Sequence, residues 1–234
     1  MNAVIFDMDG TIADTMPLCI EAFRRAVRDL TGKTLSDKEI TDTFGPSEEG
    51  TVVALVPDRV EEGVKRYLDF CKALHASMCP APFALIPEII SFLHGAGVKT
   101  ALVTGKGAKS LQINLEVFHG ETWFCHIETG NPVKADKPAG IAHTLEVLGV
   151  KKENALYVGD MASDVFSARR AGIAVAAAAW APGADKAALQ SARPDLFFEK
   201  TADFFDFLKR AYAQNDACKT EFSPFPSAKP KLDT

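Results

Sequence analysis

Two aspartates separated by one residue follow a short apolar run near the start of the chain. The run covers residues 3–6, and Asp7 and Asp9 come directly after it, before Gly10 and Thr11. In a β-strand, residues i and i+2 project to the same side, so two carboxylates placed there would repel each other. A divalent cation with oxygen ligands is the simplest compensation. The pair therefore indicates a chemical site rather than a packed core.

Short apolar runs alternate with longer helix-like stretches along most of the chain. Strands are predicted at residues 3–6, 99–103, 124–127, 155–158, 173–177 and 196–198, and helices at 87–95, 108–118, 138–148, 163–171, 185–192 and 201–213. Several strand segments are apolar throughout, as expected where both faces of a parallel sheet are covered. The pattern predicts an α/β fold with a doubly wound, mainly parallel, Rossmann-like sheet.

One region lacks this alternation. Between Pro17 and Met78 the pattern is helical, with predicted pieces at residues 21–30, 37–44, 48–56 and 58–74. We interpret it as a small all-helical cap inserted after the first strand, with a proline-containing return hinge near residue 80. We assign residues 1–15 and 82–213 to the catalytic core, 16–81 to the helical cap and 214–234 to a flexible C-terminal tail.

The composition narrows the class of protein. Of 234 residues, 47% are hydrophobic and 24% charged, and the net charge of -5 comes without a Lys/Arg cluster, so no nucleic-acid partner is expected. No apolar run approaches the roughly 18 residues that span a bilayer, so no membrane partner is expected. The first strand begins close to Met1, so we expect no signal peptide and a cytoplasmic location. The oligomeric state is expected to be monomer or homodimer.

Cysteine and histidine spacing does not predict a further site. The five cysteines are scattered without a CxxC pair, so reduced thiols are expected. The five histidines show no ligand spacing, and we expect them to be structural.

Four predicted strand ends bring polar groups to one edge of the sheet, where ligands bind in open α/β folds. Together they supply Asp7, Asp9, Thr11, Thr104, Gly105, Lys106, Lys137, Asp160 and Asp164. Carboxylates around a cation, with a hydroxyl and lysines nearby, suit a phosphate monoester, because phosphoryl transfer requires charge neutralisation and positioning.

Each of these residues receives an expected role. Asp7 is expected to attack phosphorus and form an aspartyl-phosphate. Asp9 is expected to protonate the leaving oxygen and then to take a proton from the water that cleaves this intermediate. Asp160 and Asp164 are expected to hold the cation together with Asp7. The phosphoryl-binding set is expected to be Asp7, Thr11, Thr104, Gly105, Lys106 and Lys137.

The motifs resemble those of the haloacid dehalogenase-like hydrolase superfamily. The similar segments are Asp7-Met8-Asp9-Gly10-Thr11, Thr104, Lys137, and Gly159-Asp160 with Asp164, and the resemblance covers about residues 3–213. The continuation Ile12-Ala13-Asp14-Thr15 is similar to the phosphoglycolate phosphatase-like branch, whose mobile helical cap lies between the first and second motifs.

The resemblance implies a phosphoric monoester hydrolase that depends on Mg²⁺ and acts on a small phosphorylated metabolite, phosphoglycolate-like or sugar-phosphate-like. It adds the backbone carbonyl of Asp9 to the metal ligands. Members with true dehalogenase activity lack the second aspartate, so Asp9 argues against that chemistry.

One motif departs from the family pattern. The third motif is commonly Lys-Pro-x-Pro, whereas Lys137-Pro138-Ala139-Gly140 lacks the second proline. Lys134 is a rival three residues upstream, but proline at the first helical position favours Lys137.

Other functions on the same scaffold remain open. They are a phosphomutase of the β-phosphoglucomutase type, a phosphonate- or pyrophosphate-cleaving enzyme and, more remotely, a non-enzymatic phospho-aspartate regulatory protein. The substrate depends on cap residues. Residues 44–49 are predicted to form a turn and a helix start in the cap, and the resemblance places substrate-contacting loops at such positions.

Overall fold

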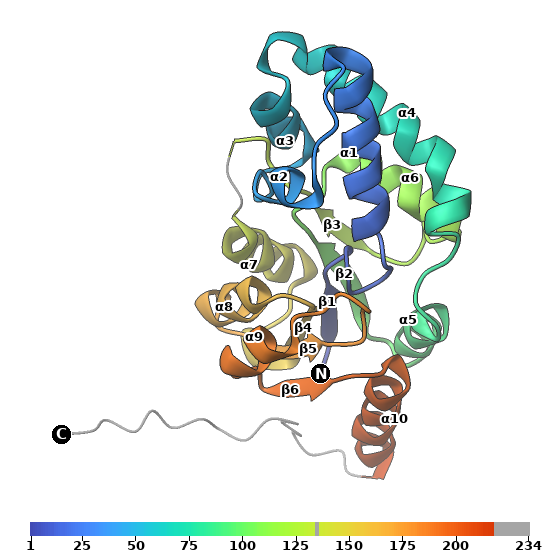
Figure 1. Cartoon of the computed structure of the whole chain (residues 1–234). Coiled ribbons are helices and arrows are strands. Elements are labelled where there is room, and N and C mark those ends of the chain that lie inside the picture. Colours follow the sequence, from blue (N-terminus) through green and yellow to red (C-terminus); the bar gives the residue numbers. More distant parts are fainter. Residues whose placement is uncertain (134–135, 218–234) are drawn as a thin grey trace, which may run out of the picture.

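The chain folds into a six-stranded parallel sheet covered by helices on both faces (Figure 1). The computed structural model describes residues 1–133 and 136–217, with side chains described up to residue 213. The strands are β1 (Ala3–Phe6), β2 (Lys99–Val103), β3 (His126–Glu128), β4 (Ala155–Gly159), β5 (Ala174–Ala178) and β6 (Leu196–Phe198). Their order is β3-β2-β1-β4-β5-β6, with every neighbouring pair parallel. The predicted doubly wound α/β fold is confirmed.

The central strand β1 supplies both cores of the sheet. Because side chains alternate along a strand, Val4 and Phe6 enter one hydrophobic cluster and Ala3 and Ile5 enter the other. The first cluster is completed by α5 (Ile86–Gly95), α6 (Ala108–Phe118) and α10 (Thr201–Ala217). The second is completed by α7 (Lys137–Leu148), α8 (Ala162–Ala171) and α9 (Lys186–Ser191). The two-sided burial holds the end of β1 at the centre of the sheet.

A helical block follows β1 and lies beyond the carboxyl ends of the strands (Figure 1). It contains α1 (Met16–Thr31), α2 (Asp37–Thr41), α3 (Glu48–Leu55), a short 3₁₀ helix (Pro57–Arg59) and α4 (Val60–Met78). The block has its own hydrophobic cluster, in which the rings of Phe23 and Tyr67 stack with centroids 4.1 Å apart. The predicted helical cap after the first strand is confirmed.

Several element boundaries differ from the prediction, and three of the differences have a clear physical basis or bear on the predicted tail. Strand β3 covers 126–128 rather than 124–127, because Phe124 packs against Phe6 in the core before the edge strand begins. Helix α1 begins at Met16, five residues early, with Pro17 in its first turn, where the missing N–H costs no hydrogen bond. Helix α10 continues to Ala217, four residues into the segment predicted to be a tail. The rest of that segment, 218–234, lies outside the described residues.

No helix in residues 1–133 and 136–217 is long and apolar enough to cross a membrane.

A second short 3₁₀ helix (Lys152–Asn154) precedes β4. It completes the path from α7 back into the sheet.

Candidate active site

Three carboxylates gather at the carboxyl end of the sheet. Asp7 follows β1, Asp160 follows β4, and Asp164 lies in the first turn of α8. Each offers an oxygen, and the three oxygens lie within 4.8 Å of one another. Asp164 is fully buried and Asp7 is 5% exposed. The structure thus brings together three of the residues that the sequence predicts as metal ligands.

Lys137 joins two of these carboxylates. Its Nζ donates to Asp7 Oδ2 at 2.5 Å and to Asp164 Oδ1 at 2.6 Å. It is the first residue of α7 and is followed by Pro138. Asp136 caps this helix by accepting a hydrogen bond from the Ala139 N–H. The alternative motif lysine, Lys134, lies outside the described residues.

Burial and charge shift the titration of this cluster. Burial raises the pKa of Asp7 to about 6; Lys137 opposes the shift and the nearby Asp164 adds to it. Burial, with Asp164 and Asp7 close by, raises the pKa of Asp160 to about 8. Burial works against the charged form of Lys137, yet Asp164 and Asp7 raise its pKa well above the usual value. One ammonium among three carboxylates leaves an excess of negative charge.

The cluster fits a cation with oxygen ligands. Asp160 Oδ1 is buried and has no hydrogen-bond partner among the described residues, and an unsatisfied buried oxygen is costly. Gly10 has φ +72°, and a Cβ there would lie 2.0 Å from Asp160 Oδ2, so only glycine lets the first loop approach this closely. An unpartnered oxygen among three convergent carboxylates is the donor set that Mg²⁺ prefers.

Asp9 belongs to a different set of contacts. Its Oδ1 accepts from the Thr15 hydroxyl and from Lys106 Nζ, the latter at 3.0 Å. Lys106 also contacts Cys19 Sγ at 3.2 Å and lies 3.7 Å from Glu48 Oε1. Burial opposes the charge of Lys106, but the surrounding anionic groups, Asp9 first, raise its pKa well above the usual value. The metal role of the Asp9 backbone carbonyl stays a prediction.

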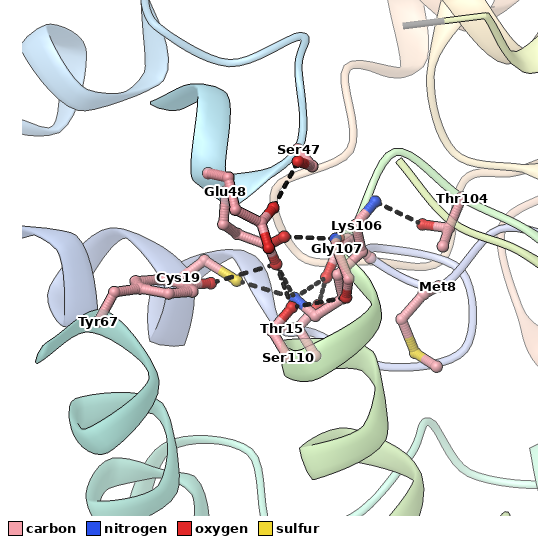
Figure 2. A network of polar contacts seen from close by, with 12 residues as sticks. Met8, Thr15, Cys19, Ser47, Glu48, Tyr67, Thr104, Lys106, Gly107 and Ser110 are labelled. Carbon is pink, nitrogen blue, oxygen red and sulfur yellow. Dashed lines mark hydrogen bonds and ion pairs between the residues drawn. The ribbon is translucent and has the colours of Figure 1, made fainter. Parts of the chain in front are cut away.

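Glu48 connects the cap to the core (Figure 2). Its carboxylate accepts from the backbone N–H of Gly107 and from the Ser110 hydroxyl, both at the start of α6, and Tyr67 Oη lies 3.5 Å away. The N–H of Ser47 also donates to the Asn131 carbonyl at 3.0 Å. A carboxylate is favourable at a helix N-terminus, so these contacts hold the cap against α6.

The remaining predicted residues line the first two loops. Thr11 Oγ1 is buried without a hydrogen-bond partner among the described residues, while its carbonyl accepts from Trp180 Nε1 at 3.0 Å. Thr104 Oγ1 accepts from the N–H of Lys106 at 3.2 Å, which shapes the turn that contains Gly105. Thr104 N also donates to the carbonyl of Glu128 at 3.1 Å, so β3 supports this turn.

Several contacting residues were not predicted from the sequence. Tyr157 lies in an apolar strand segment that indicates core, yet its hydroxyl donates to the Val103 carbonyl at 2.9 Å and lies 3.4 Å from Asp164 Oδ1. Cys19 and Ser110 carry no local signal, because each meets the site only through tertiary packing. Glu48 falls in the predicted turn and helix start of the cap, but its contact with α6 was not predicted.

The fold and the site define a class: a capped, doubly wound α/β protein with a carboxylate cluster and a buried lysine at the carboxyl edge of its sheet. The family model described as haloacid dehalogenase-like hydrolase matches residues 4–178, and the chain belongs to this family.

Known proteins resemble the chain over nearly their whole length. Pyrophosphatase PpaX of Anoxybacillus flavithermus is 28% identical over 211 residues, which cover 89% of this chain and 97% of that protein. A predicted phosphoglycolate phosphatase from Haemophilus somnus has a TM-score of 0.76 at 20% identity, covering 89% and 98% of the two chains. CbbY from Rhodobacter sphaeroides, solved with phosphate, has a TM-score of 0.72 at 19% identity, covering 87% and 96%. These two structures support the fold alone.

Without metal, we expect the protein to lose stability as the pH rises from about 4 to about 8. The pKa values of Asp7 and Asp160 rise to about 6 and about 8 on folding, from 3.8. The folded state therefore binds more protons than the unfolded state in this range, and the free energy of unfolding falls with pH. Urea unfolding in EDTA measures the slope.

Mg²⁺ should flatten this slope, because it binds the deprotonated carboxylates. The variant Asp160→Asn should flatten it without metal. A wild-type profile in EDTA that is already flat, or that matches the Asp160→Asn profile, would contradict the assignment.

Removing the Glu48 carboxylate should destabilise the protein. Glu48→Ala leaves the Gly107 N–H without its acceptor and leaves the Ser110 hydroxyl only the Gly107 carbonyl, which costs about 1–3 kcal/mol in the free energy of unfolding. Glu62→Ala is a matched control, because Glu62 makes an exposed cap ion pair with Arg59 and should cost at most about 1 kcal/mol. A double-mutant cycle of Glu48→Ala with Ser110→Ala should show coupling; strictly additive losses would argue against the contact.

Proposed function

We propose that the protein is a Mg²⁺-dependent phosphatase that hydrolyses a small phosphorylated metabolite through an aspartyl-phosphate on Asp7. One observation carries the proposal: Lys137 holds Asp7 and Asp164 at 2.5 and 2.6 Å beside the unpartnered oxygen of Asp160. A buried carboxylate, fixed by an ammonium and next to a place for a cation, suits a nucleophile for phosphorus.

The residues around Asp7 take complementary roles. Lys137 orients the Asp7 carboxylate and offsets negative charge on the phosphoryl group. Thr11 offers a buried hydroxyl with no hydrogen-bond partner among the described residues, which supports its role in binding a phosphoryl oxygen together with Thr104 and the N–H of Gly105. Mg²⁺, held by Asp7, Asp160 and Asp164, supplies neutralisation of the phosphoryl oxygens when bound.

Asp9 acts as the general acid and base. It protonates the leaving oxygen and then accepts a proton from the water that cleaves the aspartyl-phosphate. Thr15 and Lys106 fix its side chain, so the carboxyl group keeps one orientation through both steps. Lys106 lies between Asp9 and the cap residue Glu48, which places the proton-transfer group next to the cap contact.

Pyrophosphate is the first substrate to test. The relatives named pyrophosphatase PpaX are similar over nearly their whole length, which supports a phosphoanhydride as substrate. The helical cap, which we assign to residues 16–81, covers the carboxyl edge and selects substrates by closing over them.

Hydrolysis should require both Mg²⁺ and Asp7. Phosphate release from pyrophosphate, phosphoglycolate, a sugar phosphate and an aryl phosphate is measured with Mg²⁺ and with EDTA. At least one substrate should be hydrolysed only with Mg²⁺, and Asp7→Asn should lower kcat at least about a thousandfold, because it removes the nucleophile.

Asp203→Asn is the matched control, since Asp203 is exposed on α10, and it should keep the wild-type rate. Absence of metal-dependent hydrolysis of every substrate, or wild-type rates in Asp7→Asn, would overturn the proposal. Interconversion of sugar-phosphate isomers without phosphate release would identify a mutase instead.

Asp9→Asn should trap the covalent intermediate. An amide cannot accept the proton from water, so the aspartyl-phosphate should persist while its formation is only slowed. Intact-protein mass spectrometry after rapid quenching should show one added phosphoryl group, which maps to Asp7. If the quenched variant never contains the adduct while it still turns over substrate, the role of Asp9 is wrong.

A further inference from the structure

We propose that His126, Glu128 and His143 form a second metal site, which takes a transition-metal dication of the Zn²⁺ type and joins β3 to α7. The site is distinct from the carboxylate cluster and contains none of its residues. The sequence led us to expect structural histidines. The fold instead brings two of them to one carboxylate.

The donor atoms converge. One atom from each residue lies within 4.8 Å of the other two. His126 Nε2 is 2.8 Å and His143 Nδ1 is 2.6 Å from the same oxygen, Glu128 Oε1, and the two rings meet edge to face with centroids 5.6 Å apart. Three ligand atoms already face one point before any metal is added.

The backbone explains this convergence. His126 and Glu128 are two apart on β3, so their side chains project to the same side, opposite Ala101 and Val103 of β2. Helix α7 covers this side closely because Gly140 has no side chain: a Cβ there would lie 3.1 Å from Val103 Cγ1, closer than an ordinary contact, and 3.6 Å from the Cβ of Glu128. His143 is three residues further along α7 and therefore lies on the same helix face as Gly140.

The ligand set selects the class of metal. Two imidazoles and one carboxylate suit Zn²⁺, Co²⁺ or Ni²⁺, whereas Mg²⁺ prefers oxygen ligands. In a tetrahedral site, ligand atoms lie about 3.4 Å apart, so a metal must widen the present contacts slightly. The side chain of His143 is 59% exposed and has room to move, and its exposure leaves a water-accessible fourth position.

The site borders the proposed catalytic residues. Helix α7 begins at Lys137, which holds Asp7 and Asp164, and the carbonyl of Glu128 accepts from the N–H of Thr104. A metal between β3 and α7 therefore fixes the two elements that support Lys137 and Thr104. We expect metal binding to raise the melting temperature, because the folded state alone presents the three ligands together.

The test uses Co²⁺ as a spectroscopic probe on the full-length protein, with excess Mg²⁺ present to occupy the carboxylate cluster. One equivalent of Co²⁺ should bind and give the visible absorption of a low-coordinate nitrogen–oxygen site, and Zn²⁺ should displace it. His143→Ala and Glu128→Gln should each weaken Co²⁺ binding at least about tenfold.

Two controls separate this site from others. His119→Asn changes an exposed histidine at the end of α6 and should leave Co²⁺ affinity unchanged. Asp160→Asn alters the carboxylate cluster and should also leave it unchanged. Circular dichroism verifies that each variant is folded.

Three results would overturn the proposal. One is no Co²⁺ binding in the presence of Mg²⁺, which would mean that the two histidines serve only as hydrogen-bond partners of Glu128. Another is equal affinity in wild type and His143→Ala. The third is a sulfur-to-cobalt charge-transfer band, which would assign the binding to a cysteine.

Discussion

The ammonium of Lys137 is the interaction on which the rest of the structure depends. Three carboxylates meet at the end of the sheet, and removing such charges from water is costly unless they are paired. Lys137 pairs with Asp7 and Asp164. Burial, followed by the neighbouring carboxylates, still raises the pKa values of Asp7 and Asp160. The same contact requires β1, α7 and α8 to meet at one point, so charge and topology constrain each other.

A second buried lysine, Lys106, pairs with carboxylates between the core and the cap. Lys106 contacts two carboxylates, that of Asp9 in the first loop and that of Glu48 in α3, the latter shown in Figure 2. Separation of the cap from the core would take Glu48 away from Gly107 and Ser110 and expose these groups to water. The cost of separating cap and core is therefore small in hydrogen bonds, because each polar group that is exposed can be solvated. The low cost agrees with the cap closure that we propose.

Features that depend on the local sequence pattern could be predicted, whereas features that depend on tertiary packing could not. The strand before Asp7 and the helix start at Lys137 follow from apolar runs and from Pro138, which act within a few residues, so both were predicted. The contact of Tyr157 with the site was not predicted. An aromatic residue in an apolar strand gives the same local pattern whether its hydroxyl lies in the core or beside the site. The edge strand β3 was displaced by two residues, since burial of Phe124 decides where pairing begins.

Helix α7 connects two groups of ligands with different chemistry. Lys137, at its start, faces a cluster with only carboxylate oxygens, whereas His143, two turns on, faces imidazole and carboxylate on β3. Hard cations prefer the first set and borderline ones the second, so with Mg²⁺ in excess the two groups can hold different metals. Because one rigid helix carries both residues, a shift of α7 at either group changes the geometry at the other. Glu128 at the end of β3 and Lys137 at the start of α7 both make polar contacts, so the short edge strand and the helix that carries the lysine are each fixed to their neighbours.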